Sequence, residues 1–101
     1  MHKQTRKTAI PAEVKEKVFE RDGGRCVLCG RSYGALPNAH YIGRAHGGMG
    51  IEENIITLCL PCHHRYDNTD ERNEIREQLR LYLKSKYPDW DETNLIYTKW
   101  F

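Results

Sequence analysis

The sequence contains no uninterrupted apolar run of the roughly 18 residues that a membrane-spanning helix needs. Its first ten residues, MHKQTRKTAI, also lack the apolar stretch of a secretory signal. It has no internal repeat or low-complexity segment, and no Gly-Lys-Ser/Thr of a phosphate-binding loop follows the glycine-rich residues 43–50. These absences argue against membrane, secreted and P-loop proteins and predict a soluble, intracellular protein of the cytoplasm.

The chain is also short for a stable domain. With 101 residues, it buries only about two thirds of the surface that its unfolded form exposes. A hydrophobic content of 39% supports a modest core, which leaves little free energy beyond the conformational entropy lost on folding. We expect a single domain over residues 1–101 that depends on a second source of stability.

Four cysteines form two C-x-x-C pairs, Cys26 with Cys29 and Cys59 with Cys62, which 29 residues separate. In a reducing compartment, two residues between ligands let one tight turn direct both sulfurs to a single tetrahedral ion. A pair of redox-active motifs is the alternative, but it requires a βαβ context that this sequence does not show. We therefore predict a structural zinc site, whose binding free energy, on the order of 10 kcal/mol, would supply the missing stability.

Positive charge is concentrated in the part of the chain that carries the cysteines. Residues 1–66 contain ten Lys/Arg against six Asp/Glu, whereas residues 67–101 contain six against eight. A basic group precedes the first predicted helix, and scattered arginines follow that could neutralise phosphates: Lys3, Arg6 and Lys7, then Arg21, Arg25, Arg31, Arg44 and Arg65. A solvated surface explains any one of them equally well, so charge alone gives weak support for a nucleic-acid partner.

Apolar periodicity and turn residues predict an α+β chain. Pro11 opens a helical pattern over about 11–22, which two glycines end. Turns at 32–34 and 37–38 lead into a short strand at 39–42, and the β-branched run 55–58 is the returning strand of a hairpin. Four glycines within residues 43–50 indicate a flexible connection between the two strands.

Two further helices and an apolar tail follow the hairpin. Pro61 opens the first helix, residues 68–70 interrupt it, and a four-turn amphipathic helix runs from Glu71 to near Tyr87. The tail 89–101 is too apolar for a disordered end, and we expect it to pack on the first or the last helix through Trp90, Leu95, Ile96, Tyr97, Trp100 and Phe101. An aromatic surface that stacks on nucleic-acid bases is the alternative.

Polar residues between and after the cysteine pairs follow a specific order. His40 ends the first predicted strand within A-H-Y-I-G-R-A-H-G-G, Asn54 opens the second, and His63 follows the last cysteine within E-N-I-I-T-L-C-L-P-C-H-H. Over about residues 22–67, this succession resembles the HNH endonuclease family. The resemblance implies a ββα-metal fold, here flanked by N-terminal and C-terminal helices, and metal-dependent hydrolysis of DNA phosphodiester bonds by nicking or double-strand cleavage.

The resemblance also implies a role for each of these residues. His40 would be the general base that takes a proton from the attacking water, for which an imidazole with a pKa of ~6.5 is suited. Asn54 would hold the hairpin loop and so orient the base. His63 would ligate a catalytic Mg²⁺ or Mn²⁺ that is separate from the zinc. Many relatives have a second metal ligand just before the base, where this chain has Ala39.

We predict that Asp67 takes the place of this missing ligand. In a helix over 61–67, His63 and Asp67 lie four residues apart on one face, whereas His64 points about 100° away and is the weaker candidate. The carboxylate is also the harder ligand, better suited to Mg²⁺ or Mn²⁺. His46, in the glycine loop, is the next candidate for the base.

Small free-standing members of this kind resemble phage-encoded enzymes, some of them associated with genome packaging. The expected partners are therefore DNA and, by that association, phage packaging proteins. We expect contacts to the DNA backbone, without strict reading of its sequence, from Arg44, Arg65, Lys3, Arg6 and Lys7. The competing interpretation is a zinc-ribbon-like module that binds DNA or protein without cutting. It explains the cysteines and the basic residues but not the order of His40, Asn54 and His63.

Overall fold

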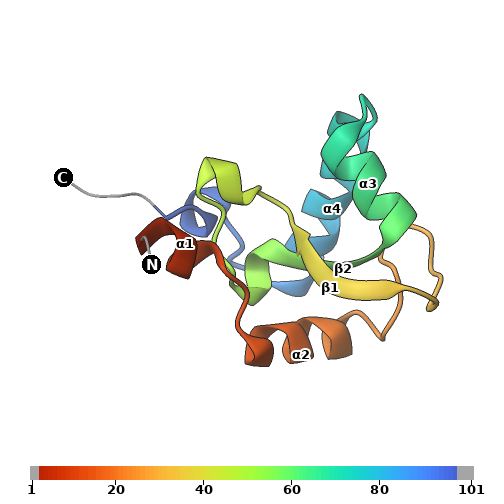
Figure 1. The fold of residues 1–101 in the computed structure, drawn as a ribbon, viewed down its shortest axis with the longest axis horizontal. Helices are drawn as coiled ribbons and strands as arrows, with labels where there is room; N and C mark the ends of the chain where they lie inside the picture. Colours follow the sequence, from red (N-terminus) through yellow and green to blue (C-terminus); the bar gives the residue numbers. More distant parts are fainter. Residues whose placement is uncertain (1–2, 98–101) are drawn as a thin grey trace.

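A two-stranded antiparallel sheet lies at the centre of the structure, a computed structural model that describes residues 3–97. Helix α2 lies on one side of the two strands, and helices α3 and α4 lie together on the other (Figure 1). The elements in chain order are α1 (Lys3–Thr8), α2 (Ala12–Arg21), β1 (Ala35–His40), η1 (Arg44–His46), η2 (Glu52–Asn54), β2 (Ile55–Cys59), α3 (Leu60–Asn68), α4 (Arg72–Lys86) and η3 (Glu92–Leu95). The predicted α+β class is confirmed.

The helices agree closely with the sequence prediction, with one addition. Pro11 precedes α2, and Gly23 and Gly24 follow it with φ near 69° and 68°, a left-handed backbone that favours glycine. Helix α4 buries the predicted apolar positions, led by Ile75 and Leu79. Helix α1, which contains the whole basic group, is not predicted. Within residues 3–97, no helix is both long and apolar enough to cross a membrane.

Strand β1 begins earlier than the turn residues indicate. The predicted turn at 37–38 is wrong, because Pro37 and Asn38 lie inside β1 at a break in the register. Leu36 pairs with Leu58 and Ala39 pairs with Ile56, so two residues of β1 lie opposite one of β2. A proline has no N–H for the ladder, and a bulge is a place where a strand tolerates it.

The glycine-rich connection is held on several sides, which corrects the expected flexible loop. Backbone bonds join it to the C-terminal tail, with Met49 N donating to Leu95 O at 2.8 Å, and to α1, with Gly50 N donating to Lys7 O at 3.0 Å. A Cβ atom at Gly50 would come within 1.9 Å of the backbone of Ala9. The glycine here permits a close approach of two backbones.

The C-terminal tail belongs to the folded structure as far as it is described. Leu95 is buried, and the Trp90 ring packs edge-on against Tyr41 with centroids 5.5 Å apart. The Trp90 Nε1 donates to the backbone of Glu53 at 2.9 Å. The core interpretation is therefore confirmed for Leu95 and for the partly buried Trp90. The tail packs on the hairpin and its connection, and it meets the last helix where Glu92 accepts from Arg76 of α4 at 3.1 Å. Ile96, expected in the same core, is exposed. Trp100 and Phe101 lie outside the described residues.

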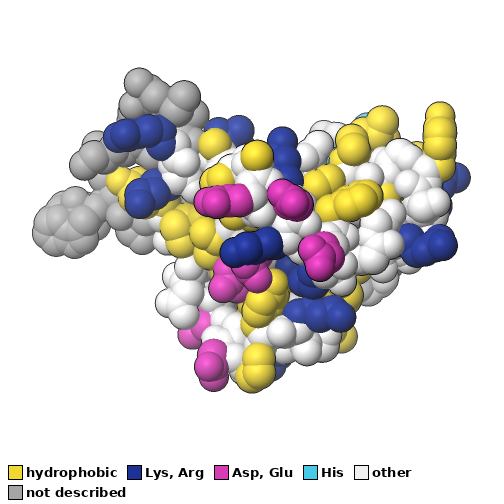
Figure 2. Space-filling view, turned by 90° about the horizontal axis from the view of Figure 1, so that it is seen from below, with side chains coloured by type: hydrophobic (Ala, Val, Ile, Leu, Met, Phe, Trp, Pro, Cys, Tyr) yellow, Lys and Arg dark blue, Asp and Glu magenta, His cyan; other side chains and the backbone are white. Residues whose placement is uncertain are grey.

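Arg21 is part of the framework of the fold, so neither of its two suggested roles, a phosphate contact or a solvated surface residue, describes it. Its guanidinium binds the Asp22 carboxylate at 2.7 and 3.0 Å and two backbone carbonyls, of Glu52 and Ile55, both at 2.7 Å. Asp22 in turn accepts from the Thr57 N–H at 2.9 Å. The hydrogen bonds of Arg21 and Asp22 join the end of α2 to the hairpin. On the molecular face that carries α2, side chains of both signs of charge lie together (Figure 2).

Candidate functional site

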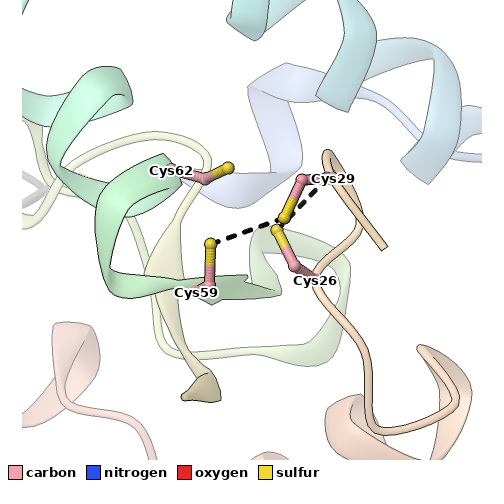
Figure 3. Close-up of side chains that lie close together, drawn as sticks. All are labelled: Cys26, Cys29, Cys59 and Cys62. Carbon is pink, nitrogen blue, oxygen red and sulfur yellow. Dashed lines mark hydrogen bonds between the residues drawn. The ribbon is translucent and has the colours of Figure 1, made fainter. Parts of the chain in front are cut away.

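The four cysteine sulfurs converge from three parts of the fold. Cys26 and Cys29 lie in the turn after α2, Cys59 ends β2, and Cys62 lies in the first turn of α3. All four Sγ atoms lie within 4.8 Å of one another, and those of Cys29 and Cys59 are 3.6 Å apart (Figure 3). The predicted cluster is confirmed, and it ties the hairpin to the helix that follows.

The cluster has the dimensions of a tetrahedral zinc site. A Zn–S bond of about 2.3 Å places neighbouring sulfurs about 3.8 Å apart in a tetrahedron. The four thiols are free, and three of the cysteines are buried. Burial opposes ionisation of Cys26, but backbone N–H donors, first that of Cys29, lower its pKa to about 7. Cys26 can therefore ionise near neutral pH, whereas burial raises the pKa of Cys59 and of Cys62. The close approach of the four sulfurs is what allows them to hold a metal ion such as zinc.

His40 ends β1 and is held by a residue from the N-terminal helix. Its Nε2 lies 2.8 Å from the backbone carbonyl oxygen of Thr8. Because a carbonyl only accepts, we assign the ring proton to Nε2, which leaves Nδ1 with a free lone pair. Thr8 is buried, and its hydroxyl accepts from Arg44 Nε at 3.1 Å.

The surroundings of His40 keep its ring neutral. Burial lowers the pKa of His40 below its ordinary value, and the charges of Arg44 and His63 lower it further, whereas the Thr8 carbonyl and Asp67 act in the opposite sense. At neutral pH the imidazole is therefore unprotonated at Nδ1, the state that a general base requires. The influence of His63 and Asp67 also reflects the contact of α3 with β1.

His63 and Asp67 lie together on one face of α3, as the helical spacing predicts. The His63 Nε2 is 3.0 Å from Asp67 Oδ2, and both side chains reach solvent, with exposed fractions of 27% and 47%. The other oxygen, Asp67 Oδ1, lies 3.9 Å from the Nη1 of Arg72. His64 is exposed on α3, and its Nδ1 lies 3.2 Å from the amide nitrogen of Asn68.

Asn54 is fully buried and closes the connection between the strands. Its Oδ1 accepts from Ile42 N at 2.8 Å, and its Nδ2 donates to the carbonyls of Ile42 at 3.1 Å and Met49 at 2.9 Å. The backbone oxygen of Asn54 accepts from Tyr41 N at 2.8 Å. The chain directly after His40 is thus fixed from both the side chain and the backbone of this one residue.

The residues predicted to contact DNA, and the alternative base His46, lie on several different elements. Arg44 joins them through Thr8, and Arg6 and Lys7 are exposed on α1, to which Lys3 also belongs. Arg65 lies elsewhere, with its Nη2 2.9 Å from Glu71 and its Nη1 3.9 Å from the Cys62 sulfur. His46 is exposed in η1.

Sequence reasoning missed Thr8 as a partner of His40. Its contact with the ring uses a backbone carbonyl, which any residue type could supply, so the amino-acid letter carries no signal for it. Only the position of the basic group just upstream of Thr8 could have drawn attention to this segment.

No protein-family model matches this chain, and a search of curated proteins finds no significant match. Among residues 3–97, the four cysteines are the only group of three or more His, Cys, Asp or Glu residues whose ligand atoms lie this close together. His63 and Asp67 therefore form a pair of candidate ligands rather than a complete metal shell.

Proposed function

We propose that this protein is a metal-dependent endonuclease of the HNH type that hydrolyses DNA phosphodiester bonds. The observation that supports this best is the setting of His40. Its neutral imidazole is anchored at one nitrogen, ends the first strand of an antiparallel hairpin, and lies beside a helix that presents His63 and Asp67. An anchored neutral histidine next to two candidate metal ligands suits phosphodiester hydrolysis better than binding alone.

In the proposed reaction, His40 acts through its Nδ1 atom. This nitrogen takes a proton from a water molecule as the water oxygen attacks the phosphorus, and the bond to the 3′ oxygen breaks. The bond of Nε2 to Thr8 keeps the ring in the tautomer and orientation that the transfer needs. Asn54 is a positioning residue, because it fixes the backbone of the two residues that follow His40.

The donor atoms of His63 and Asp67 fit a hard divalent cation. Asp67 supplies a carboxylate oxygen and His63 an imidazole nitrogen on adjacent turns of one helix. Mg²⁺ is often held by one or two carboxylates, with waters and substrate oxygens completing its shell, so a small protein ligand set is sufficient. When bound, such an ion would supply positive charge to a phosphate oxygen and to the leaving oxygen. Zinc at the cysteines would be structural and would hold the hairpin to α3.

The basic residues that adjoin His40 suggest how DNA would approach. Arg44 contacts Thr8, which also contacts His40, and Arg6 and Lys7 are exposed on the same short helix as Thr8. These cations could bind the phosphate backbone near the base without reading sequence. Arg65 is a poorer candidate, because its guanidinium faces Glu71 and the Cys62 sulfur rather than the segment around His40.

Incubation of the purified protein with supercoiled plasmid and each divalent ion in turn tests this proposal. We expect nicked or linear product only with added Mg²⁺ or Mn²⁺. His40→Ala should reduce the rate roughly 100-fold or more while DNA binding and folding persist, as expected for a positioned base. His46→Ala removes the next candidate for the base and should keep the hydrolysis rate at saturating DNA if the base is His40. Binding without cleavage under every ion would favour the zinc-ribbon-like module instead.

A further inference from the structure

We propose that a cavity whose Arg72 approaches Asp67 binds a backbone phosphate of the DNA strand, at a nucleotide next to the one that is cut. This inference rests on the proposed nuclease function and adds a substrate subsite to it. The cavity, about 400 Å³ in volume, lies between the segment after β1, helix α4 and the turn η3. We call it the arginine cavity, after Arg72 and Arg76, which line it together with His46 and Glu92.

The arginine cavity brings together two guanidinium groups, each of which also faces one carboxylate, Asp67 for Arg72 and Glu92 for Arg76. Arg72 and Arg76 lie one turn apart on α4, with exposed side-chain fractions of 37% and 45%. Arg76 bonds the Tyr41 hydroxyl at 3.3 Å and Glu92 at 3.1 Å, and Arg72 bonds the backbone of Tyr66 at 3.0 Å. A guanidinium has five N–H donors, so donors remain on both side chains for an anion. Among the described residues, Glu92 is the single carboxylate that lines the cavity.

Aromatic rings hold both guanidinium groups in place. The guanidinium carbon of Arg72 lies 4.4 Å from the centroid of the Tyr66 ring, and that of Arg76 lies 5.2 Å from the centroid of the Tyr41 ring. A stacked guanidinium loses less freedom when it binds, and its planar fork matches two oxygens of a phosphate. The cavity therefore presents two oriented guanidinium groups that can donate hydrogen bonds to a phosphate, rather than two mobile charges.

The arginine cavity is joined to the candidate catalytic site by one carboxylate. Asp67 Oδ2 lies 3.0 Å from His63 Nε2, while Asp67 Oδ1 lies 3.9 Å from Arg72 Nη1. Tyr41, which lines the cavity, directly follows His40 in the chain. A strand whose scissile phosphate lies at His40 and His63 would bring a neighbouring phosphate to the arginines. The apolar side chains of Ile42 and Ile96 in the cavity wall suit contact with deoxyribose.

Binding of a fluorescein-labelled DNA duplex, measured by anisotropy without added divalent ions, tests the cavity separately from cleavage. The variants are Arg72→Ala, Arg76→Ala and their combination. Arg80→Ala is the matched control, because Arg80 lies one turn further along α4, outside the cavity, and is paired with Glu77. We expect the slope of log Kd against log salt to fall by about one for each cavity arginine. At ~0.1 M salt, Kd should rise roughly tenfold for each arginine removed and roughly 100-fold in the double variant.

Salt slopes that match Arg80→Ala would overturn the subsite, and so would a wild-type protein that binds no duplex. Arg72→Lys and Arg76→Lys keep the charge and lose the fork, so they should keep the salt slope and weaken binding. These lysine variants also serve if the alanine variants do not fold. Inorganic phosphate that displaces the duplex at an equal concentration of phosphate groups would assign the cavity to a free anion and overturn the proposal.

The two proposals fail in different ways. A wild-type protein that nicks plasmid while its cavity variants behave like Arg80→Ala contradicts the subsite alone. A wild-type protein whose DNA binding depends on Arg72 and Arg76, but which cuts under no divalent ion, contradicts the nuclease alone.

Discussion

The Nε2 atom of His40 lies 2.8 Å from the backbone carbonyl oxygen of Thr8, a residue 32 positions earlier in the chain. The same segment accepts two further hydrogen bonds. The Gly50 N–H donates to the Lys7 carbonyl, and the Arg44 Nε donates to the Thr8 hydroxyl. The end of α1 therefore joins the candidate base to the connection between the strands. A segment outside the resemblance to the HNH family, which begins near residue 22, thus completes the surroundings of the base.

The acidity of His40 leads to a prediction for the pH profile. Because burial, and then Arg44 and His63, lower the pKa of His40, the neutral ring persists to lower pH than an ordinary histidine. In the proposed DNA cleavage, kcat/KM should then fall on the acidic side only at a pH below about 6.5, the ordinary pKa of histidine. Arg44→Gln removes one positive charge, so it should raise the pKa of His40 and move this fall in kcat/KM to higher pH.

NMR titration of the His40 ring in the same variants checks this assignment independently of cleavage. Arg80→Gln, a change of equal charge on an exposed part of α4, should leave both the titration and the fall in kcat/KM in place. An unmoved His40 titration in Arg44→Gln would contradict the prediction.

The pairing on α3 predicts which residue completes the proposed catalytic metal site. Asp67→Ala should raise the Mn²⁺ concentration for half-maximal cleavage about tenfold or more, since loss of even a supporting partner of a metal ligand costs that much. His64→Ala should change it little, because His64 lies beside Asn68 rather than beside His63. The comparison requires cleavage titrations of both variants, and the opposite ranking would transfer the role to His64.

The cysteine cluster predicts one zinc ion per chain and a fold that depends on it. Cys26→Ser and Cys59→Ser should each lose the ion and unfold the domain, because neither half of the cluster forms a tetrahedron alone. Elemental analysis gives the stoichiometry, and circular dichroism follows melting. Metal-free protein that melts as cooperatively as the zinc-loaded form would contradict this prediction.

The network of Arg21 and Asp22 predicts a large loss of stability without any change at the candidate site. The Asp22 carboxylate is fully buried and the Arg21 side chain is 12% exposed. Arg21→Met leaves a buried charge without its partner, which typically costs about 3–5 kcal/mol of unfolding free energy. Urea denaturation measures this loss. Arg80→Met breaks only an exposed pair, so an equal effect of the two variants would count against the assigned role of Arg21.

The sequence by itself determined the features that depend on neighbouring residues. Pro11 and the pair Gly23 and Gly24 delimit α2, because a proline suits the first turn of a helix and glycine adopts the left-handed backbone after its end. The short C-x-x-C spacing likewise determined which sulfurs could meet, and the four-residue spacing on α3 determined that His63 and Asp67 share a face.

Only the tertiary structure decided the features that depend on distant backbone. Pro37 is a turn residue by local preference, yet pairing with β2 places it in a strand at a bulge. The charge of Arg21 suggests a surface residue, yet its guanidinium donates to backbone carbonyls more than 30 positions away in the chain. The contact of Thr8 with His40 uses a main-chain oxygen that every residue has. The sequence gives the chemistry of each side chain directly, whereas the backbone group to which a side chain bonds depends on how the whole chain packs.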